Sequence, residues 1–132
     1  YFVPLDQFQS FIDHLRRTVQ QYKVNLLNIT LRYMAQNKDT LLSYSLQETI
    51  AVVLYANIGR DQQSTDLAEK WTRNLIDNAI SLGGTYYLTY QGFATKEQMR
   101  QVYPAFRQFQ SIKQKYDPNE VFVNKFYQQY WK

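Results

Sequence analysis

Three polar residues alternate along the stretch NLLNITLRY and end in a guanidinium. If this stretch is a β-strand, Asn28, Thr30 and Arg32 fall on one face, because successive side chains point to opposite faces. A guanidinium presents N–H donors in a fixed planar arrangement that suits carboxylates and other oxygen-rich groups. The row is therefore a candidate site for an anionic or hydroxyl-bearing ligand, and a merely hydrated surface is the alternative.

A second candidate for chemistry is the tyrosine-rich stretch TYYLTY, Thr85–Tyr90, within LGGTYYLTYQGFATKEQMRQVYP. As a strand it would place Tyr86 and Tyr90 on one face and Tyr87 on the other. One layer of helices covers one face of a sheet, so at least one of these faces is expected to meet a second surface. Tyr87 and Tyr90 reach the same site only if the strand bends or bulges after Leu88. An ordinary aromatic core strand is the alternative interpretation.

The other titratable residues do not combine into a catalytic group. His14, the only histidine, precedes two arginines in the sequence, a setting typical of the surface. No pair of carboxylates with a nearby base is apparent. The chain has no cysteine, which excludes disulfides and thiol catalysis, and we predict no metal site. Gly83 and Gly84 follow a predicted helix instead of preceding one, so no phosphate-binding loop is predicted either.

The composition indicates one folded domain. The chain has 132 residues, of which 45% are hydrophobic, and this is enough for one core. Aromatic residues make up 17%, including 12 tyrosines, which favours partly buried surfaces with hydroxyls that need partners. The net charge of +4 suits an anionic partner without requiring one, and we predict no nucleic-acid partner. No apolar run approaches the roughly 20 residues of a transmembrane helix. The compartment stays open, with the cytoplasm as our expectation.

Apolar periodicity divides the chain into strands and helices. Following a short strand at YFV, the spacing predicts a helix over residues 7–22, strands at KVNLLNITLRYM and ETIAVVLYANI, and a second helix before Gly83. The last strand is TYYLTY. Thr95 and Gln98 form a capping-box pattern that begins a third helix, and Pro104 breaks or restarts it.

The order β-α-β-β-α-β with extra C-terminal helices predicts an α+β fold. It is typical of a ferredoxin-like antiparallel sheet with both long helices on one face. The apolar side chains of the second strand are predicted to pack under the helices: Leu27, Ile29, Leu31 and Tyr33. The polar row Asn28, Thr30 and Arg32 then lies on the open face.

Four stretches occur in an order seen in one enzyme family: YFVPLDQFQSFIDHLR, VNLLNITLRYM, ETIAVVLYANI and LGGTYYLTYQGFATKEQMRQVYPAFRQFQSIKQKYDPNEVFVNKFY. The most specific part is KQKYDPNEVFVNKFY, in which K-x-x-x-D-P is followed by Phe and Asn. Together they resemble the C-terminal domain of FAD-linked oxidases of the vanillyl-alcohol-oxidase type. The resemblance covers nearly the whole chain.

The resemblance implies a two-domain enzyme. The protein's own N-terminal domain would bind FAD, and this domain would cover the isoalloxazine and form the pocket for a small hydroxylated substrate. Hydride would move from a substrate C–H to the flavin. The resemblance implies catalytic roles for Arg32, Tyr87 and Tyr90, substrate binding by Asn28, Thr30 and Arg32, and cofactor contacts from Tyr87 and Asn124.

Three positions differ from the members of this family that act on sugars. Those members carry E-x-R on the strand that corresponds to NITLRYM, and here Thr30 stands in place of the glutamate while Arg32 matches. They also carry G-G-x-x-H-x-x-K, and here both glycines match while Tyr87 and Tyr90 replace His and Lys.

A ferredoxin-like binding module without catalysis is the alternative function. RNA-recognition domains hold single-stranded RNA on such a sheet, and an exposed face also suits a protein partner or self-association. The tyrosine strand, however, lacks the K/R-G-F/Y-G/A-F-V pattern of those domains. The chain starts without Met inside an apparent strand, which we interpret as a fragment of a longer polypeptide. We expect the fragment by itself to bind no FAD and to be inactive.

Overall fold

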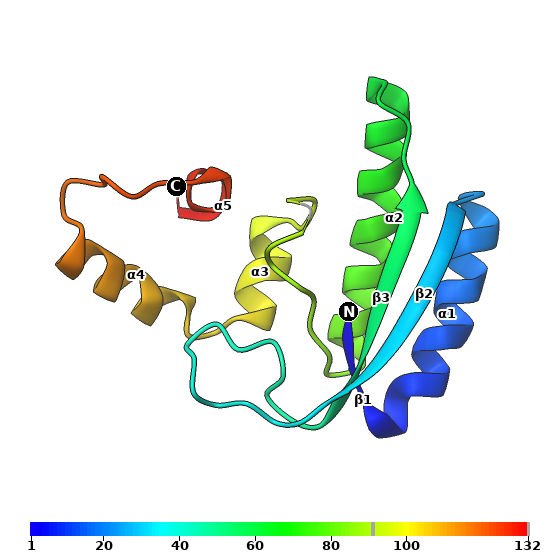
Figure 1. Cartoon of the computed structure of the whole chain (residues 1–132), viewed down its shortest axis with the longest axis horizontal. Helices are drawn as coiled ribbons and strands as arrows, with labels where there is room; N and C mark the ends of the chain where they lie inside the picture. The colour runs from blue at the N-terminus through cyan, green and yellow to red at the C-terminus, as the bar shows by residue number, and fades with distance from the viewer. Residues whose placement is uncertain (91, 132) are drawn as a thin grey trace.

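The computed structural model describes residues 1–90 and 92–131. These residues form three strands and five α-helices, which confirms the predicted α+β class (Figure 1). The elements are β1 (Phe2–Pro4), the 3-10 turn η1 (Leu5–Gln7), α1 (Phe8–Gln21), β2 (Asn25–Met34), β3 (Thr49–Asn57), α2 (Gln62–Ser81), α3 (Lys96–Val102), α4 (Phe106–Tyr116) and α5 (Lys125–Trp131). None of the helices in the described ranges is long and apolar enough to cross a membrane.

The sheet is antiparallel, with the strand order β1-β3-β2. The predicted fourth strand, TYYLTY, is reduced to a single bridge in which Phe2 and Thr85 exchange N–H···O bonds of 2.9 and 2.8 Å. Beyond Thr85 the chain leaves the sheet. One physical reason is that the buried hydroxyl of Tyr103 donates to the carbonyl oxygen of Tyr86, so that this carbonyl needs no partner in a strand.

Both long helices pack on the same face of the sheet, as predicted. Val3 of β1 and Val52 of β3 lie beneath Phe11 of α1 and Leu75 of α2, and all four side chains are at most 1% exposed. The helices form where the sequence places apolar residues three or four positions apart, because this spacing gives each helix one apolar side. Within residues 1–90 and 92–131, no helix lies on the opposite face of the sheet (Figure 1).

The apolar row of β2 is not buried, which corrects the prediction. Leu27, Ile29, Leu31 and Tyr33 are 67%, 38%, 51% and 57% exposed. The last three do lie on the helix side, opposite Leu54, Val52 and Ile50, while Leu27 is the unpaired residue of an irregularity between Leu26 and Asn28. The reason is position: β2 is an edge strand, and the core cluster lies over β1 and β3.

Helices α3 to α5 form a second cluster beside α2 (Figure 1). The predicted capping box at the start of α3 is present, with Thr95 and Gln98 each accepting the other's backbone N–H. The side-chain amide of Gln98 also donates to Asp77 at 2.6 Å and to the Arg73 carbonyl at 3.0 Å. One residue therefore both begins α3 and attaches it to α2.

The turn after α4 is held by the carboxylate of Asp117. It accepts the backbone N–H groups of Val121 and Phe122 at 2.8 and 2.9 Å and forms an ion pair with Lys113. The Lys113 ammonium also lies over the ring of Tyr127, 5.1 Å from its centroid. These contacts tie the turn to α4 and α5.

Asp117→Asn is expected to remove a component of acid sensitivity. The hydrogen bond from Lys113, followed by those from the backbone, lowers the pKa of Asp117 from 3.8 to about 2. A lowered pKa stabilises the fold above the unfolded-state value, so this contribution is present above about pH 4 and is lost as the pH falls towards 2. Unfolding measured from pH 2 to 7 should show this loss in the wild type and not in the variant. Asp39→Asn, at an exposed loop carboxylate, is the control. An identical acid profile for the wild type and Asp117→Asn would contradict the assignment.

Candidate functional site

The tyrosine segment is positioned by a close contact between Gly84 and β1. The N–H of Gly84 donates to the Ala79 carbonyl at 2.7 Å, which ends α2, and the Phe2–Thr85 bridge follows at once. A Cβ atom at Gly84 would lie 2.5 Å from the Phe2 carbonyl oxygen. Only glycine allows the two backbones to approach this closely.

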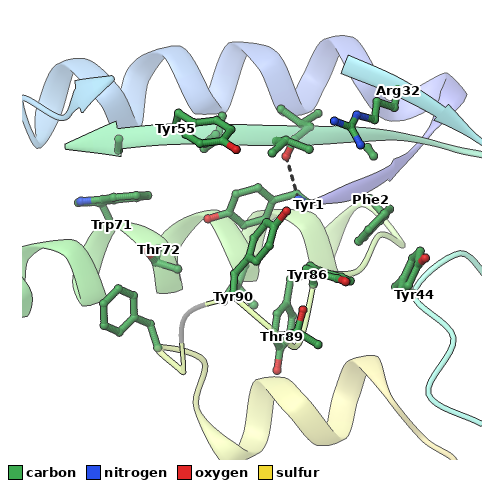
Figure 2. Close-up of a pocket in the computed structure, with 18 of the residues that line it drawn as sticks. Tyr1, Phe2, Arg32, Tyr44, Tyr55, Trp71, Thr72, Tyr86, Thr89 and Tyr90 are labelled. Atoms are coloured by element: carbon green, nitrogen blue, oxygen red, sulfur yellow. Dashed lines mark hydrogen bonds between the residues drawn. The ribbon is translucent and has the colours of Figure 1, made fainter. Parts of the chain in front are cut away.

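A cavity of about 590 Å³ lies around the edge of β3, beyond the point where β1 pairs with it. Figure 2 shows Trp71 and Thr72 of α2 on one side of it, Arg32 and Tyr55 of the sheet on the other, and Tyr90 reaching in from the loop. The cavity therefore touches both faces of the sheet. Its inner part lies against α2 and its outer part on the open face.

The open-face part is built on one row of residues that crosses all three strands. Phe2 of β1 pairs with Ala51 of β3, and Ala51 pairs with Arg32 of β2, so the three side chains point to the same side. All three line the cavity. An aromatic ring and a guanidinium thus stand on either side of a single methyl group.

Four aromatic rings form a continuous wall next to this row. Phe2 stacks on Tyr44 with ring centroids 4.4 Å apart, and Tyr87 meets both rings edge-on at 6.2 and 5.5 Å. Tyr90 in turn meets Tyr87 at 4.7 Å and 77°. Edge-to-face contacts of this kind hold rings in fixed orientations.

The cavity carries one net positive charge. Among the described residues that line it, Arg32 is the only charged side chain, and no described carboxylate lies within 4.0 Å of its guanidinium. Burial raises the pKa of the Tyr1 and Tyr86 phenols, which keeps both neutral. Within residues 1–90 and 92–131, no group of three His, Asp or Glu side chains could hold a metal.

The structure brings together three of the predicted site residues. Arg32, Tyr87 and Tyr90 all line the cavity, although they come from β2 and a loop more than fifty positions later. The chain makes a turn at Leu88–Thr89, at the place where the predicted bend is required, and this turn brings the two tyrosine rings into contact.

The other three predicted residues do not line the cavity. Asn28 and Thr30 lie on the same open face as Arg32, opposite the lining residues Tyr55 and Val53. Asn124 lies before α5, where its side chain accepts the backbone N–H of Tyr127 at 2.8 Å. Its observed contact is that of a helix cap, and the cofactor contact stays a prediction.

The sequence analysis missed several lining residues: Phe2, Tyr44, Ala51, Tyr55 and Trp71. Phe2 and Ala51 are identifiable only once the strand register is known, because the register sets which residues stand beside Arg32. Tyr44 belongs to the long connection between β2 and β3, which carries no periodic signal. Tyr55 could have been identified from the sequence, since alternation on the predicted strand ETIAVVLYANI places it on the face opposite the buried Val52.

Comparison with known proteins identifies the family of the chain. The family model described as D-arabinono-1,4-lactone oxidase matches residues 1–130. A search of curated proteins finds no match to the chain. The match of the family model extends over nearly the whole sequence, from β1 through α5. The chain therefore belongs to the D-arabinono-1,4-lactone oxidase family, a family of C-terminal domains of FAD-linked oxidases.

Proposed function

We propose that this chain is the C-terminal substrate domain of an FAD-dependent oxidoreductase. Together with the protein's own N-terminal FAD-binding domain it would cover the flavin ring and form the pocket in which a small hydroxylated substrate is oxidised. The observation that carries the proposal is the cavity that Arg32, Tyr87 and Tyr90 all line. Membership in a family of oxidase domains favours this function over the alternative of a binding module.

The residues of the cavity fit the flavin ring better than the rest of FAD. Aromatic and aliphatic side chains make up most of the described lining, as a planar heterocycle requires. A diphosphate has few partners here, because Arg32 is the only charged side chain among the described residues that line the cavity. We therefore assign the dinucleotide part of FAD to the other domain.

Substrate orientation is the proposed task of Arg32. When bound, FAD would accept the hydride that leaves the carbinol carbon of the substrate, while the hydroxyl proton departs and a carbonyl group forms. Arg32 would hold an oxygen of the substrate through charge-assisted hydrogen bonds. Tyr87 and Tyr90 would donate hydrogen bonds to the substrate and exclude water from it. We assign them hydrogen bonding to the substrate and no proton abstraction.

Exposed apolar side chains support a second domain as the partner. Leu27 and Leu31 on β2 are 67% and 51% exposed, and Val121 and Phe122 in the turn after α4 are 71% and 79% exposed. Monomeric domains rarely leave such side chains in groups without a use for them. These two pairs lie on different sides of the domain (Figure 1), and we propose that the N-terminal FAD-binding domain covers one of them.

Tyr87→Phe and Tyr90→Phe test the role of the tyrosine segment. Each change keeps the ring and its contacts and removes one hydroxyl, so thermal stability should change little. Loss of one hydrogen bond, worth about 0.5–1.5 kcal/mol, should slow anaerobic reduction of the flavin by substrate about 2- to 12-fold in at least one variant.

The measurement is stopped-flow absorbance with the full-length protein. Tyr116→Phe is the matched control, because Tyr116 is 77% exposed at the end of α4 and does not line the cavity. If both Tyr87→Phe and Tyr90→Phe reduce the flavin at the wild-type rate, the two hydroxyls have no role in the reaction and the rings only line the cavity. Full-length protein that is purified in folded form without any FAD would contradict the proposed function as a whole.

A further inference from the structure

The edge of β3 that faces the cavity is unpaired over its second half. β2 pairs with β3 along its whole length, whereas β1 pairs only with Thr49–Ala51, and Tyr1 adds a pair with Val52. Within residues 1–90 and 92–131, no other segment forms backbone hydrogen bonds with β3 beyond Val52 on that side. The sequence VLYAN of this half contains no charged residue and no proline, the usual features that protect a strand edge from pairing.

The hydrogen bonds between Tyr1 and Val52 identify the peptide groups that point to this edge. The Tyr1 nitrogen donates to the Val52 carbonyl at 2.9 Å, and the Val52 N–H donates to the Tyr1 carbonyl at 2.7 Å. Successive residues of a strand direct their N–H and C=O groups to opposite edges. The next groups at this edge therefore belong to Leu54 and Ala56, while those of Val53 point to β2.

The space beside this edge is apolar on the helix side. Trp71 belongs to the core cluster under α1 and α2, Ile58 and Phe93 pack against that cluster, and all three line the cavity. Figure 2 shows Trp71 below the edge and Tyr55 on β3, where Tyr55 is 61% exposed on the open face. An extended segment placed here would bury its helix-side residues and present the others to the open face.

The position of β1 identifies the segment that fits. β1 lies antiparallel to β3 on this same edge, so a strand paired with Leu54 and Ala56 is in line with β1 and continues its hydrogen bonds. Polypeptide joined to Tyr1 reaches this position without a loop. A strand from a second copy would instead have to occupy the place that this polypeptide takes.

We propose that the residues of the same polypeptide that precede Tyr1 continue β1 and pair with Leu54 and Ala56 of β3. This inference rests on one part of the proposed function, namely that an N-terminal domain belongs to the same polypeptide. It goes beyond that function, because it gives the connection between the two domains a defined structure and a place in the cavity.

The added strand divides the cavity into a core part and a site part. If the register of β1 continues, the second residue before Tyr1 stands opposite Leu54 on the helix side. This residue is expected to be apolar. The first and third residues stand opposite Val53 and Tyr55 on the open face, where they add two side chains to the part of the cavity that contains Arg32.

Disulfide formation in the full-length protein tests the pairing and its register. One cysteine is introduced at the third residue before Tyr1 and the other by Tyr55→Cys, after any native cysteine of the preceding polypeptide has been replaced by serine. Residues directly opposite each other in antiparallel strands have Cα atoms about 4.5–5.5 Å apart, which a disulfide can bridge. We expect an intramolecular disulfide on mild oxidation, identified by mass mapping of peptides.

The matched control moves the first cysteine by one position, to the second residue before Tyr1, and keeps Tyr55→Cys. A shift of one residue turns the side chain to the other face of the sheet, so this pair should not form a disulfide. Absence of the disulfide in the test pair, or equal formation in both pairs, would contradict the added strand. A disulfide that links two molecules would contradict the assignment of this edge to the same polypeptide.

Hydrogen exchange of the unsubstituted full-length protein is an independent measurement. The amides of Leu54 and Ala56 should exchange within about tenfold of the rate of Val53, whose N–H points to β2, because all three are then paired. Exchange of Leu54 and Ala56 at the rate of an unstructured peptide would overturn the inference. If the test disulfide forms in a folded full-length protein that contains no FAD, the proposed function is wrong while the added strand stands.

Discussion

Arg32→Ala should lower kcat/KM of the full-length enzyme by about 10- to 150-fold, since a hydrogen bond to a charged group contributes about 1.5–3 kcal/mol. The guanidinium lies on the open face of the sheet, beside Ala51 and at the end of the cavity, and it has no ion-pair partner within the described ranges. Its removal therefore leaves substrate oxygen atoms unbound without opening a hole in the core.

The free energy of unfolding should change by less than about 0.5 kcal/mol in this variant, as for other exposed side chains. Arg32→Lys should recover only part of the activity, because an ammonium lacks the planar pair of donors. Arg17→Ala, at an exposed position of α1, is the control and should leave kinetics unchanged. Steady-state kinetics that do not change in Arg32→Ala, with FAD still bound, would remove Arg32 from the site.

Gly84→Ala should destabilise the domain by about 1–3 kcal/mol, the usual cost of inserting atoms into a packed region. The added Cβ would lie 2.5 Å from the Phe2 carbonyl oxygen and 3.0 Å from that of Ala79. Both obstacles are backbone atoms, so a side-chain rotation cannot relieve the contact. We expect β1 and the segment after Gly84 to separate, which breaks the Phe2–Thr85 bridge and displaces the aromatic wall.

Chemical denaturation measures the loss of stability, and flavin reduction in the full-length protein measures the displacement of the site. Gly83→Asn is the matched control one residue earlier. Gly83 has φ of 73°, a conformation that asparagine tolerates, and a Cβ there would meet only Gln47 at 3.9 Å. This control should cost less than about 1 kcal/mol and leave flavin reduction unchanged. Equal effects of the two changes would mean that the close backbone approach at Gly84 is not what positions the segment.

The local features of the fold could be predicted from the sequence. The spacing of Phe11 and Leu15 determines which side of α1 is buried, and the pair Thr95 and Gln98 marks the start of α3. These signals depend on interactions between residues a few positions apart, so they do not require knowledge of the rest of the chain. The division of β2 into two faces between Asn28 and Met34 is local in the same sense.

Features that depend on contacts between distant parts of the chain were decided only by the tertiary structure. Burial of the apolar row on β2 was predicted wrongly, because alternation indicates a face but not whether a helix covers it. The segment after Thr85 was predicted as a strand. In the structure the hydroxyl of Tyr103 donates a hydrogen bond to the carbonyl oxygen of Tyr86, and the chain turns away from the sheet.

The candidate site shows the same division. By itself the sequence determined the strand that carries Arg32, the open face on which Arg32 lies, and the need for a bend between Tyr87 and Tyr90. Only the strand order β1-β3-β2 placed Phe2, Ala51 and Arg32 in one row. A pattern along one strand specifies the direction of a side chain. Its neighbours across the sheet follow from pairing between residues about twenty to fifty positions apart, which depends on the packing of the whole domain.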